Sequence, residues 1–194
     1  MNALDIKIRK EAIKSSVVLG LILLSLNIFL FYLITSISKS PMMVLVIGPQ
    51  LLSIVLPLFI AILLSINIRK KVGGYWTFKQ AATGIFILFL IAYLVKIIGN
   101  DLVFDKFIEP HSVEKIQAAD IDAKIIILQQ KHSSEKEITQ AIGDLKKYFA
   151  TQQNVSVWSI IQGDVMFILF LFLFALAMAS FLRNAKYVPA SAEQ

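Results

Sequence analysis

The chain has 194 residues, of which 57% are hydrophobic, and it carries a formal net charge of +6. Its mean hydropathy is +0.74, and so large an apolar share exceeds that of ordinary soluble domains, so a bilayer must cover much of the surface. The absence of cysteine excludes disulfide frameworks, cysteine-based zinc sites and thiol nucleophiles. Because the basic residues flank hydrophobic segments, the positive charge indicates membrane topology, and we expect no nucleic-acid partner.

Four apolar segments are each long enough to cross a bilayer as a helix, which takes about 20 residues. Within one integral membrane domain, 1–194, we place these spans near residues 16–37, 42–66, 81–104 and 157–182. The first is longer than the apolar core of a signal peptide, so we expect it to remain uncleaved. Pro49 and Pro57 predict a bend in the second, since proline removes a backbone donor. The predicted fold class is all-α, a four-transmembrane-helix membrane protein.

The loop between the second and third spans combines cations, two glycines and two aromatic residues. Cations favour the cytoplasmic side, Gly-Gly permits a turn, and tyrosine and tryptophan suit the membrane interface. Thr77 and Gln80 then form a capping box that predicts the start of the third helix. Binding of an anionic lipid head group or a phosphate is the alternative to simple anchoring. The candidate interfacial or lipid-head-group residues are Arg69, Lys70, Lys71, Gly73, Gly74, Tyr75 and Trp76.

The positions of lysine and arginine predict the orientation of the chain. Ten lysine and arginine residues lie before the first span, in the second loop and after the last span, whereas the first loop has only Lys39. The long third loop, taken from about residue 101 to 157, is close to neutral, with seven lysines against nine acidic residues. By the positive-inside rule, we expect both termini in the cytoplasm and residues 105–153 on the extracytoplasmic side of a cell inner membrane.

The third loop has the pattern of two helices. Ser112 is predicted to cap a helix that reaches about Gln130. Ser134 and Glu137 form a second capping box, and apolar residues follow at spacings of three and four. We expect a helical hairpin on the outer side whose apolar faces pack on each other or on the membrane surface, with a partner-binding face as the alternative.

Several short motifs occur in an order that resembles an uncharacterised family of bacterial four-span integral membrane proteins, carried as a domain of unknown function. The motifs are the basic stretch with Gly73-Gly74-x-x-Thr77-Phe78, the segment from Ala81 to Gly84, and Phe107-Ile108-Glu109-Pro110. The resemblance covers nearly the whole chain. It implies a multi-pass membrane architecture, and it supplies no catalytic residue and no substrate.

Lys96 and Asp164 are the formal charges that lie away from the ends of the predicted spans, whereas Asp101 stands near the outer end of the third. Counted from the outer ends of their helices, each lies roughly 10 to 12 Å below the outer surface. Ionisable groups in lipid are costly, so the two form a candidate intramembrane polar pair. The alternatives are snorkelling or local hydrogen bonding, and a proton- or ion-handling site. Asn27, Asn100 and Gln162 are candidates for the same polar patch.

The sequence contains no catalytic or nucleotide-binding motif, so we lean against an enzyme and expect no cofactor. His111 and His132 are far apart within the third loop, and no metal site is expected there. Our leading hypothesis is a non-catalytic association or accessory subunit of an envelope complex, acting as a homo-oligomer or with an envelope protein. The alternative is a small oligomeric transporter or channel that uses Lys96 and Asp164.

Overall fold

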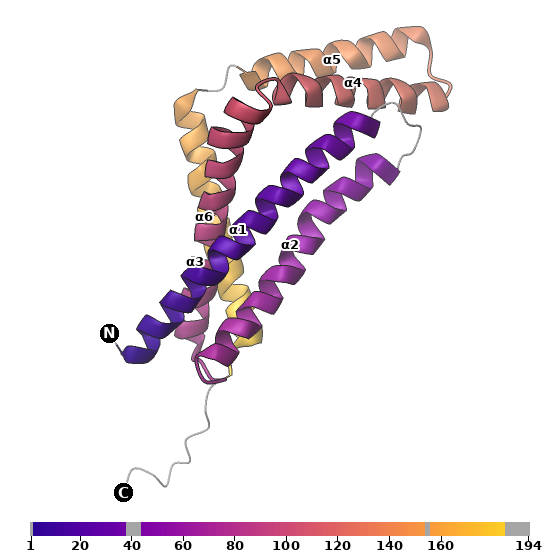
Figure 1. Ribbon diagram of the computed structural model, residues 1–194. Coiled ribbons are helices and arrows are strands. Elements are labelled where there is room, and N and C mark those ends of the chain that lie inside the picture. The colour runs from indigo at the N-terminus through magenta and orange to yellow at the C-terminus, as the bar shows by residue number, and fades with distance from the viewer. Residues whose placement is uncertain (1, 38–43, 154–155, 185–194) are drawn as a thin grey trace, which may run out of the picture. The chain divides into compact units, whose positions relative to one another are not determined.

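The computed structural model describes residues 2–37, 44–153 and 156–184, which are helical apart from short connections (Figure 1). The helices are α1 (Ala3–Ile37), α2 (Val44–Lys71), α3 (Phe78–Ile97), the π-helix η1 (Ile98–Ile108), α4 (Ser112–Gln130), α5 (Glu135–Gln153) and α6 (Val157–Leu182). In these described ranges there is no β-strand, and four helices have the length and hydropathy to cross a membrane. They are α1, α2, α3 continued by η1, and α6. The predicted all-α class with four spans is confirmed.

The chain divides into two compact units. Unit 1 comprises Met1–Leu23, Pro57–Ile97 and Val165–Gln194, and unit 2 comprises Leu24–Leu56 and Ile98–Asp164. The division falls inside each of the four spans, so every span contributes one segment to each unit. The hairpin of α4 and α5 belongs wholly to unit 2.

α1 begins at Ala3, well before the span that we predicted to start near residue 16. Its first turns are charged, but Ile8 and Ala12 on one face are buried in unit 1. A helix that packs one face on protein can expose charged side chains on the other. The helix therefore extends beyond its apolar segment because protein contacts on its buried face stabilise its beginning.

α2 ends in a Schellman motif built by the two glycines of the basic loop. The Gly73 N–H donates to the Lys70 carbonyl (3.2 Å) and the Gly74 N–H to the Arg69 carbonyl (2.9 Å). Both glycines have positive φ, 115° and 84°, where a Cβ would be strained. The turn predicted at Gly73-Gly74 is confirmed. Its two N–H groups close the helix, so they are not free to hold a phosphate.

The last turn of α2 passes the predicted end of the span at residue 66 and reaches Lys71. Ile68 and Val72 are buried in unit 1, so protein contacts hold this turn in the helix. The predicted start near residue 42 lies outside the described residues. The bend expected from Pro49 and Pro57 stays a prediction.

The third span changes its helical type. α3 begins at Phe78, after a capping box in which the Thr77 N–H donates to Gln80 Oε1 (3.0 Å) and the Gln80 N–H to Thr77 Oγ1 (3.3 Å). This box confirms the predicted start. From Ile98 the chain continues as a π-helix, where we had predicted an α-helix to residue 104. Apolar periodicity does not separate the two forms, because they differ in whether the N–H of residue i+4 or of residue i+5 reaches a given carbonyl.

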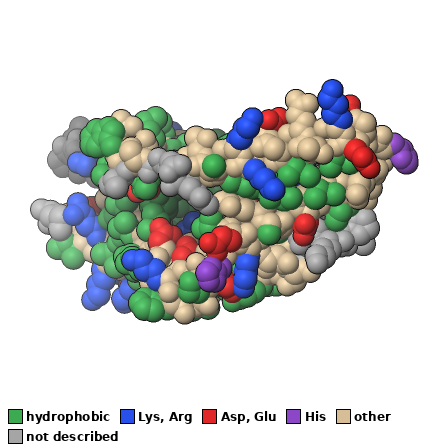
Figure 2. All heavy atoms as spheres, turned by 90° about the horizontal axis from the view of Figure 1, so that it is seen from above, with side chains coloured by type: hydrophobic (Ala, Val, Ile, Leu, Met, Phe, Trp, Pro, Cys, Tyr) green, Lys and Arg blue, Asp and Glu red, His purple; other side chains and the backbone are tan. Residues whose placement is uncertain are grey.

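α4 and α5 lie side by side as the predicted hairpin (Figure 1). The face that carries this hairpin mixes charged and hydrophobic side chains (Figure 2). The capping box of α5 is confirmed, since the Ser134 N–H donates to Glu137 Oε2 (2.9 Å) and the Glu137 N–H to Ser134 Oγ (3.4 Å). The cap predicted for α4 is wrong. His111 occupies the N-cap position without a side-chain cap, and Ser112 is the first helical residue.

α1 and α3 approach each other closely within unit 1. The Ser16 hydroxyl donates to the Ala12 carbonyl of its own helix (2.6 Å) and contacts the Ile87 carbonyl of α3 (3.2 Å). A Cβ added to Gly20 would lie only 2.6 Å from the Cβ of Val95. Small residues of this kind let two membrane helices pack backbone to backbone.

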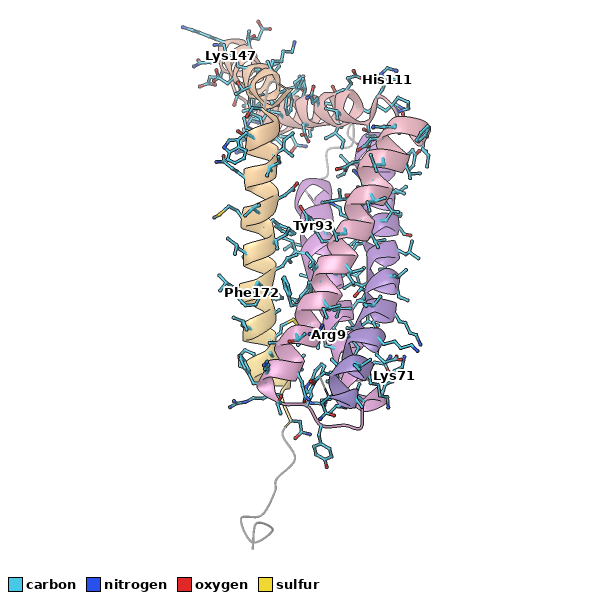
Figure 3. All side chains as sticks on the ribbon, turned by 90° about the vertical axis from the view of Figure 1, so that its left-hand side faces the viewer. Arg9, Lys71, Tyr93, His111, Lys147 and Phe172 are labelled. Atoms are coloured by element: carbon cyan, nitrogen blue, oxygen red, sulfur yellow. The ribbon has the colours of Figure 1, made fainter. Side chains whose placement is uncertain are left out.

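α3 and α6 meet in unit 1 through aromatic rings, and Figure 3 labels one such residue on each helix, Tyr93 on α3 and Phe172 on α6. Ring centroids 4.5 to 7 Å apart are typical of favourable aromatic pairs. The pairs are Phe86 with Phe172 (5.4 Å), Phe89 with Phe174 (5.6 Å) and Tyr93 with Phe167 (4.7 Å). Phe167, Phe172 and Phe174 of the last span therefore pack on α3, whereas Phe170 and Phe181 are more exposed.

Candidate functional site

Trp76 is the centre of the base of unit 1, by which we mean the first turns of α1, the last turn of α2, the loop 72–77, the first turn of α3 and the end of α6 with Arg183 and Asn184. Its side chain is 1% exposed, and its ring packs against Gly84, where an added Cβ would lie 3.3 Å from Cζ3. The indole Nε1–H donates to the Leu182 carbonyl (2.8 Å). Its backbone exchanges two hydrogen bonds with Asn184 (3.0 and 3.2 Å). Trp76 thus fastens the end of α6 to the loop.

Arg69 reinforces this fastening. Its Nη1 donates to the same Leu182 carbonyl (3.1 Å), which lies at the carboxyl end of α6. The last carbonyls of a helix have no partner within the helix and carry partial negative charge. A guanidinium and an indole from the α2–α3 region therefore cap α6 from outside.

Two carboxylates tie α1 to the same base. Glu11 pairs with Lys71 (3.3 Å) and with Lys14 (3.5 Å), and Asp5 accepts a hydrogen bond from Gln80 (3.0 Å). The Lys71 ammonium at Glu11 holds the pKa of that carboxyl below its ordinary value. The first turns of α1, the loop 72–77 and the end of α6 accordingly lie at one end of unit 1.

The predicted interfacial loop therefore splits into inward and outward residues. Trp76 points into the protein and does not have the exposure of an interfacial anchor, whereas Tyr75 is 47% exposed. Arg69 and Lys71 are engaged in the contacts above, and Lys70 is exposed. The sequence did not reveal this division, because an aromatic residue beside cations at the end of a span is usually interfacial. A lipid-head-group role for the loop stays a prediction.

The two intramembrane charges belong to different units. Lys96 lies in unit 1 and Asp164 in unit 2, and both are half-buried. The lateral ion pair of Lys96 with Asp164 inside the membrane therefore stays a prediction.

Asn27 and Asn100, which we expected in one polar patch, meet within unit 2. Asn27 Nδ2 donates to Asn100 Oδ1 (2.6 Å), and Asn100 Nδ2 donates to Asp105 Oδ2 (2.9 Å) and Asp101 Oδ1 (3.1 Å). The other oxygen of Asp105 accepts from the buried Ser112 hydroxyl (2.8 Å). One chain of hydrogen bonds thus links α1, η1 and the start of α4.

The π-helix accounts for this geometry. Asn100 and Asp105 are five residues apart, and a π-helix places residues i and i+5 one turn apart. Ser112 does not cap α4, because its hydroxyl donates to Asp105. Neither Asp105 nor the bond of Ser112 to it was expected from the sequence, although the five-residue spacing of Asn100 and Asp105 near the end of a span was a usable signal.

Within residues 2–37, 44–153 and 156–184, no group of three or more histidine, aspartate or glutamate side chains is arranged to hold a metal ion. The polar clusters of both units instead join helices to one another. Each cluster contains donors matched to acceptors, and no buried side-chain nitrogen or oxygen of the described residues lacks a partner.

One family model matches this chain over residues 14–184, from the last cation before the first apolar segment to the Asn184 that pairs with Trp76. Its description is "Protein of unknown function (DUF4199)". No curated protein and no solved structure matches the chain. The matched segment contains the apolar parts of all four spans and the whole hairpin. By this match, the chain belongs to the DUF4199 family.

Proposed function

We propose that the chain is a multi-pass protein of a bacterial inner membrane that works by association and not by catalysis. Its termini lie in the cytoplasm, and the hairpin of α4 and α5 lies on the outer side. Charge supports this orientation, because cations crowd the base of unit 1 whereas the hairpin, residues 112–153, carries six acidic residues and six lysines and so has no net charge. The partner is a second copy of the chain or another envelope protein.

The proposal rests on the root of the hairpin, by which we mean the beginning of α4 and the end of α5. Val113 (56% exposed), Ile116 (38%) and Tyr148 (58%) present large apolar surface, although α4 and α5 already pack on each other. Since the two helices are antiparallel, the beginning of α4 and the end of α5 lie together. Lipid covers the apolar side chains of the spans, but these three lie outside the spans. Exposed apolar patches outside lipid are typical of protein contact sites.

Cysteine cross-linking in native membranes tests this proposal, and the cysteine-free sequence makes single variants free of background. Ile116→Cys is expected to form a cross-linked product with a short bismaleimide, because position 116 lies in the contact. Lys136→Cys, an exposed residue at the first turn of α5, is the matched control and should not. A product of twice the chain mass indicates a homodimer, and any other mass indicates an envelope partner that mass spectrometry identifies.

Failure of both variants to cross-link, together with a monomeric and partner-free chain after purification in mild detergent, would contradict association. Immersion of the hairpin root in the membrane surface gives a different result. In that case Ile116→Cys does not cross-link but is protected from a water-soluble maleimide by lipid alone.

The transporter or channel hypothesis makes a different prediction. It requires a water-filled route to Lys96 and Asp164, both half-buried within apolar spans. Lys96→Cys should then react with a membrane-impermeant maleimide in intact cells. The association hypothesis expects this position to stay protected.

A further inference from the structure

The base of unit 1 has a strong excess of positive charge. It holds nine lysine and arginine side chains in the described residues outside the apolar segments, against the carboxylates of Asp5 and Glu11 alone. Both carboxylates are engaged by neighbours, Asp5 by Gln80 and Glu11 by Lys14 and Lys71. The remaining cations therefore have no internal carboxylate left to neutralise them.

Two of these cations stand on lipid-facing stripes. On α1, Ile6, Lys10, Ile13 and Val17 are all exposed, and their spacing of four, three and four residues places them on one face. The opposite face of the same turns, with Ile8 and Ala12, is buried. Lys10 is thus flanked along the helix by exposed isoleucines.

α2 repeats this pattern. Phe59 and Leu63 are exposed, and Lys70 follows seven residues after Leu63 on the same face of the helix. Lys71, one residue on, turns to another side and reaches Glu11 at 3.3 Å. The contact between Lys71 and Glu11 brings the two helices together at this height. Lys70 and Lys10 are the residues directly before them in the chain, so they stand at the same height along unit 1.

We propose that Lys10 and Lys70 bind the head groups of anionic phospholipids, in preference to zwitterionic ones. The phosphate of such a lipid supplies the negative charge that the base lacks, and its acyl chains cover the apolar stripe beside each lysine. A soluble nucleic acid or acidic protein would neutralise the charge but would leave the isoleucines and Leu63 uncovered. This site shares only Lys70 with the predicted loop site, because Arg69, Lys71 and the glycine N–H groups are already engaged. It does not depend on the proposed association through the hairpin.

Native mass spectrometry of the full chain in mild detergent tests the proposal, with phosphatidylglycerol or phosphatidylcholine added. The wild-type chain is expected to retain phosphatidylglycerol preferentially, and each of Lys10→Gln and Lys70→Gln should weaken that retention about fivefold, as expected for one lysine at an anionic surface. The double variant Lys10→Arg with Lys70→Arg should keep it, since the charge is preserved. The matched control is Lys136→Gln with Lys146→Gln, which removes two exposed lysines from the hairpin and should leave retention unchanged.

Three results would overturn the site. Equal retention of both lipids by the wild-type chain removes the preference, and equal loss in the hairpin control shows a general effect of net charge. Displacement of phosphatidylglycerol by soluble inorganic phosphate, beyond the effect of chloride at the same ionic strength, shows that free phosphate and not lipid is the ligand. Thermal unfolding of each variant verifies that retention is compared between folded chains.

Discussion

Replacing Trp76 tests whether the base of unit 1 is a structural clamp. A buried tryptophan removes roughly 150 to 250 Å² from solvent, which corresponds to about 4 to 6 kcal/mol at the usual apolar coefficient. Measured tryptophan-to-alanine losses in cores are about 3 to 5 kcal/mol. Trp76→Ala should therefore lower the free energy of unfolding by about 3 to 5 kcal/mol, because its 1% exposure places the whole ring in the interior.

Trp76→Phe separates the ring from its hydrogen bond. Phenylalanine fills most of the space but cannot donate to the Leu182 carbonyl, which still accepts from Arg69. We therefore expect a smaller loss, about 1 to 2 kcal/mol. Trp158 is the matched control, since it is the same residue type at 66% exposure, and Trp158→Ala should cost less than about 1 kcal/mol.

The assay is reversible unfolding in mixed micelles with increasing SDS, followed by circular dichroism for all variants. A Trp158→Ala loss as large as that of Trp76→Ala would refute the assignment of Trp76 to the core. Equal losses for Trp76→Ala and Trp76→Phe would also refute it, since they would make the indole N–H, and not the packed ring, the source of the stability.

Three further predictions concern other parts of the chain. Gly20→Ala should destabilise by about 1 to 3 kcal/mol because the new methyl meets α3, whereas Gly163→Ala, with nothing within 4 Å, should be neutral or stabilise in the same unfolding assay. His132 has φ of 55° at the end of α4, so His132→Gly should raise the melting temperature of the hairpin, and a fall would show that the side chain itself is needed. Glu11, in the charged turns before the apolar segment, has a pKa lowered chiefly by its hydrogen bond to Lys71. Its contribution is present above its unfolded pKa and lost as pH falls through the lower folded value, so the wild-type and Glu11→Gln chains should differ in stability at neutral pH and converge below about pH 4.

Features with a local cause were predictable from the sequence. The spans follow from apolar length, and the two capping boxes follow from side chains that bond backbone groups three residues away. The Gly73-Gly74 turn follows from glycine's freedom at positive φ. In each case the residues that make the structure are neighbours in the chain.

Most features that depend on distant partners were not predictable, although the contact of Asn27 with Asn100 was expected. The indole of Trp76 bonds a carbonyl 106 positions later, and nothing near Trp76 in the sequence distinguishes it from an interfacial anchor. Ser112 is a residue type that commonly caps helices, but here its hydroxyl donates to Asp105. The π-helix likewise depends on contacts around Asn100 that span α1, η1 and α4.

Hydrogen bonds made by side chains within the spans bear on the choice between association and transport. The Ser16 and Ser65 hydroxyls donate to carbonyls of their own helices, and Ser16 also contacts α3. In unit 2 the amide of Asn27 is directed at Asn100. In lipid such groups need partners, and bonds of this kind contribute about 1 kcal/mol or less each as glue between helices. A transport route needs polar groups that face water, whereas Ser16 and Asn27 bond a neighbouring helix and Ser65 bonds its own. These polar groups therefore hold the helices of each unit together, and the maleimide accessibility of Lys96→Cys remains the measurement that separates association from transport.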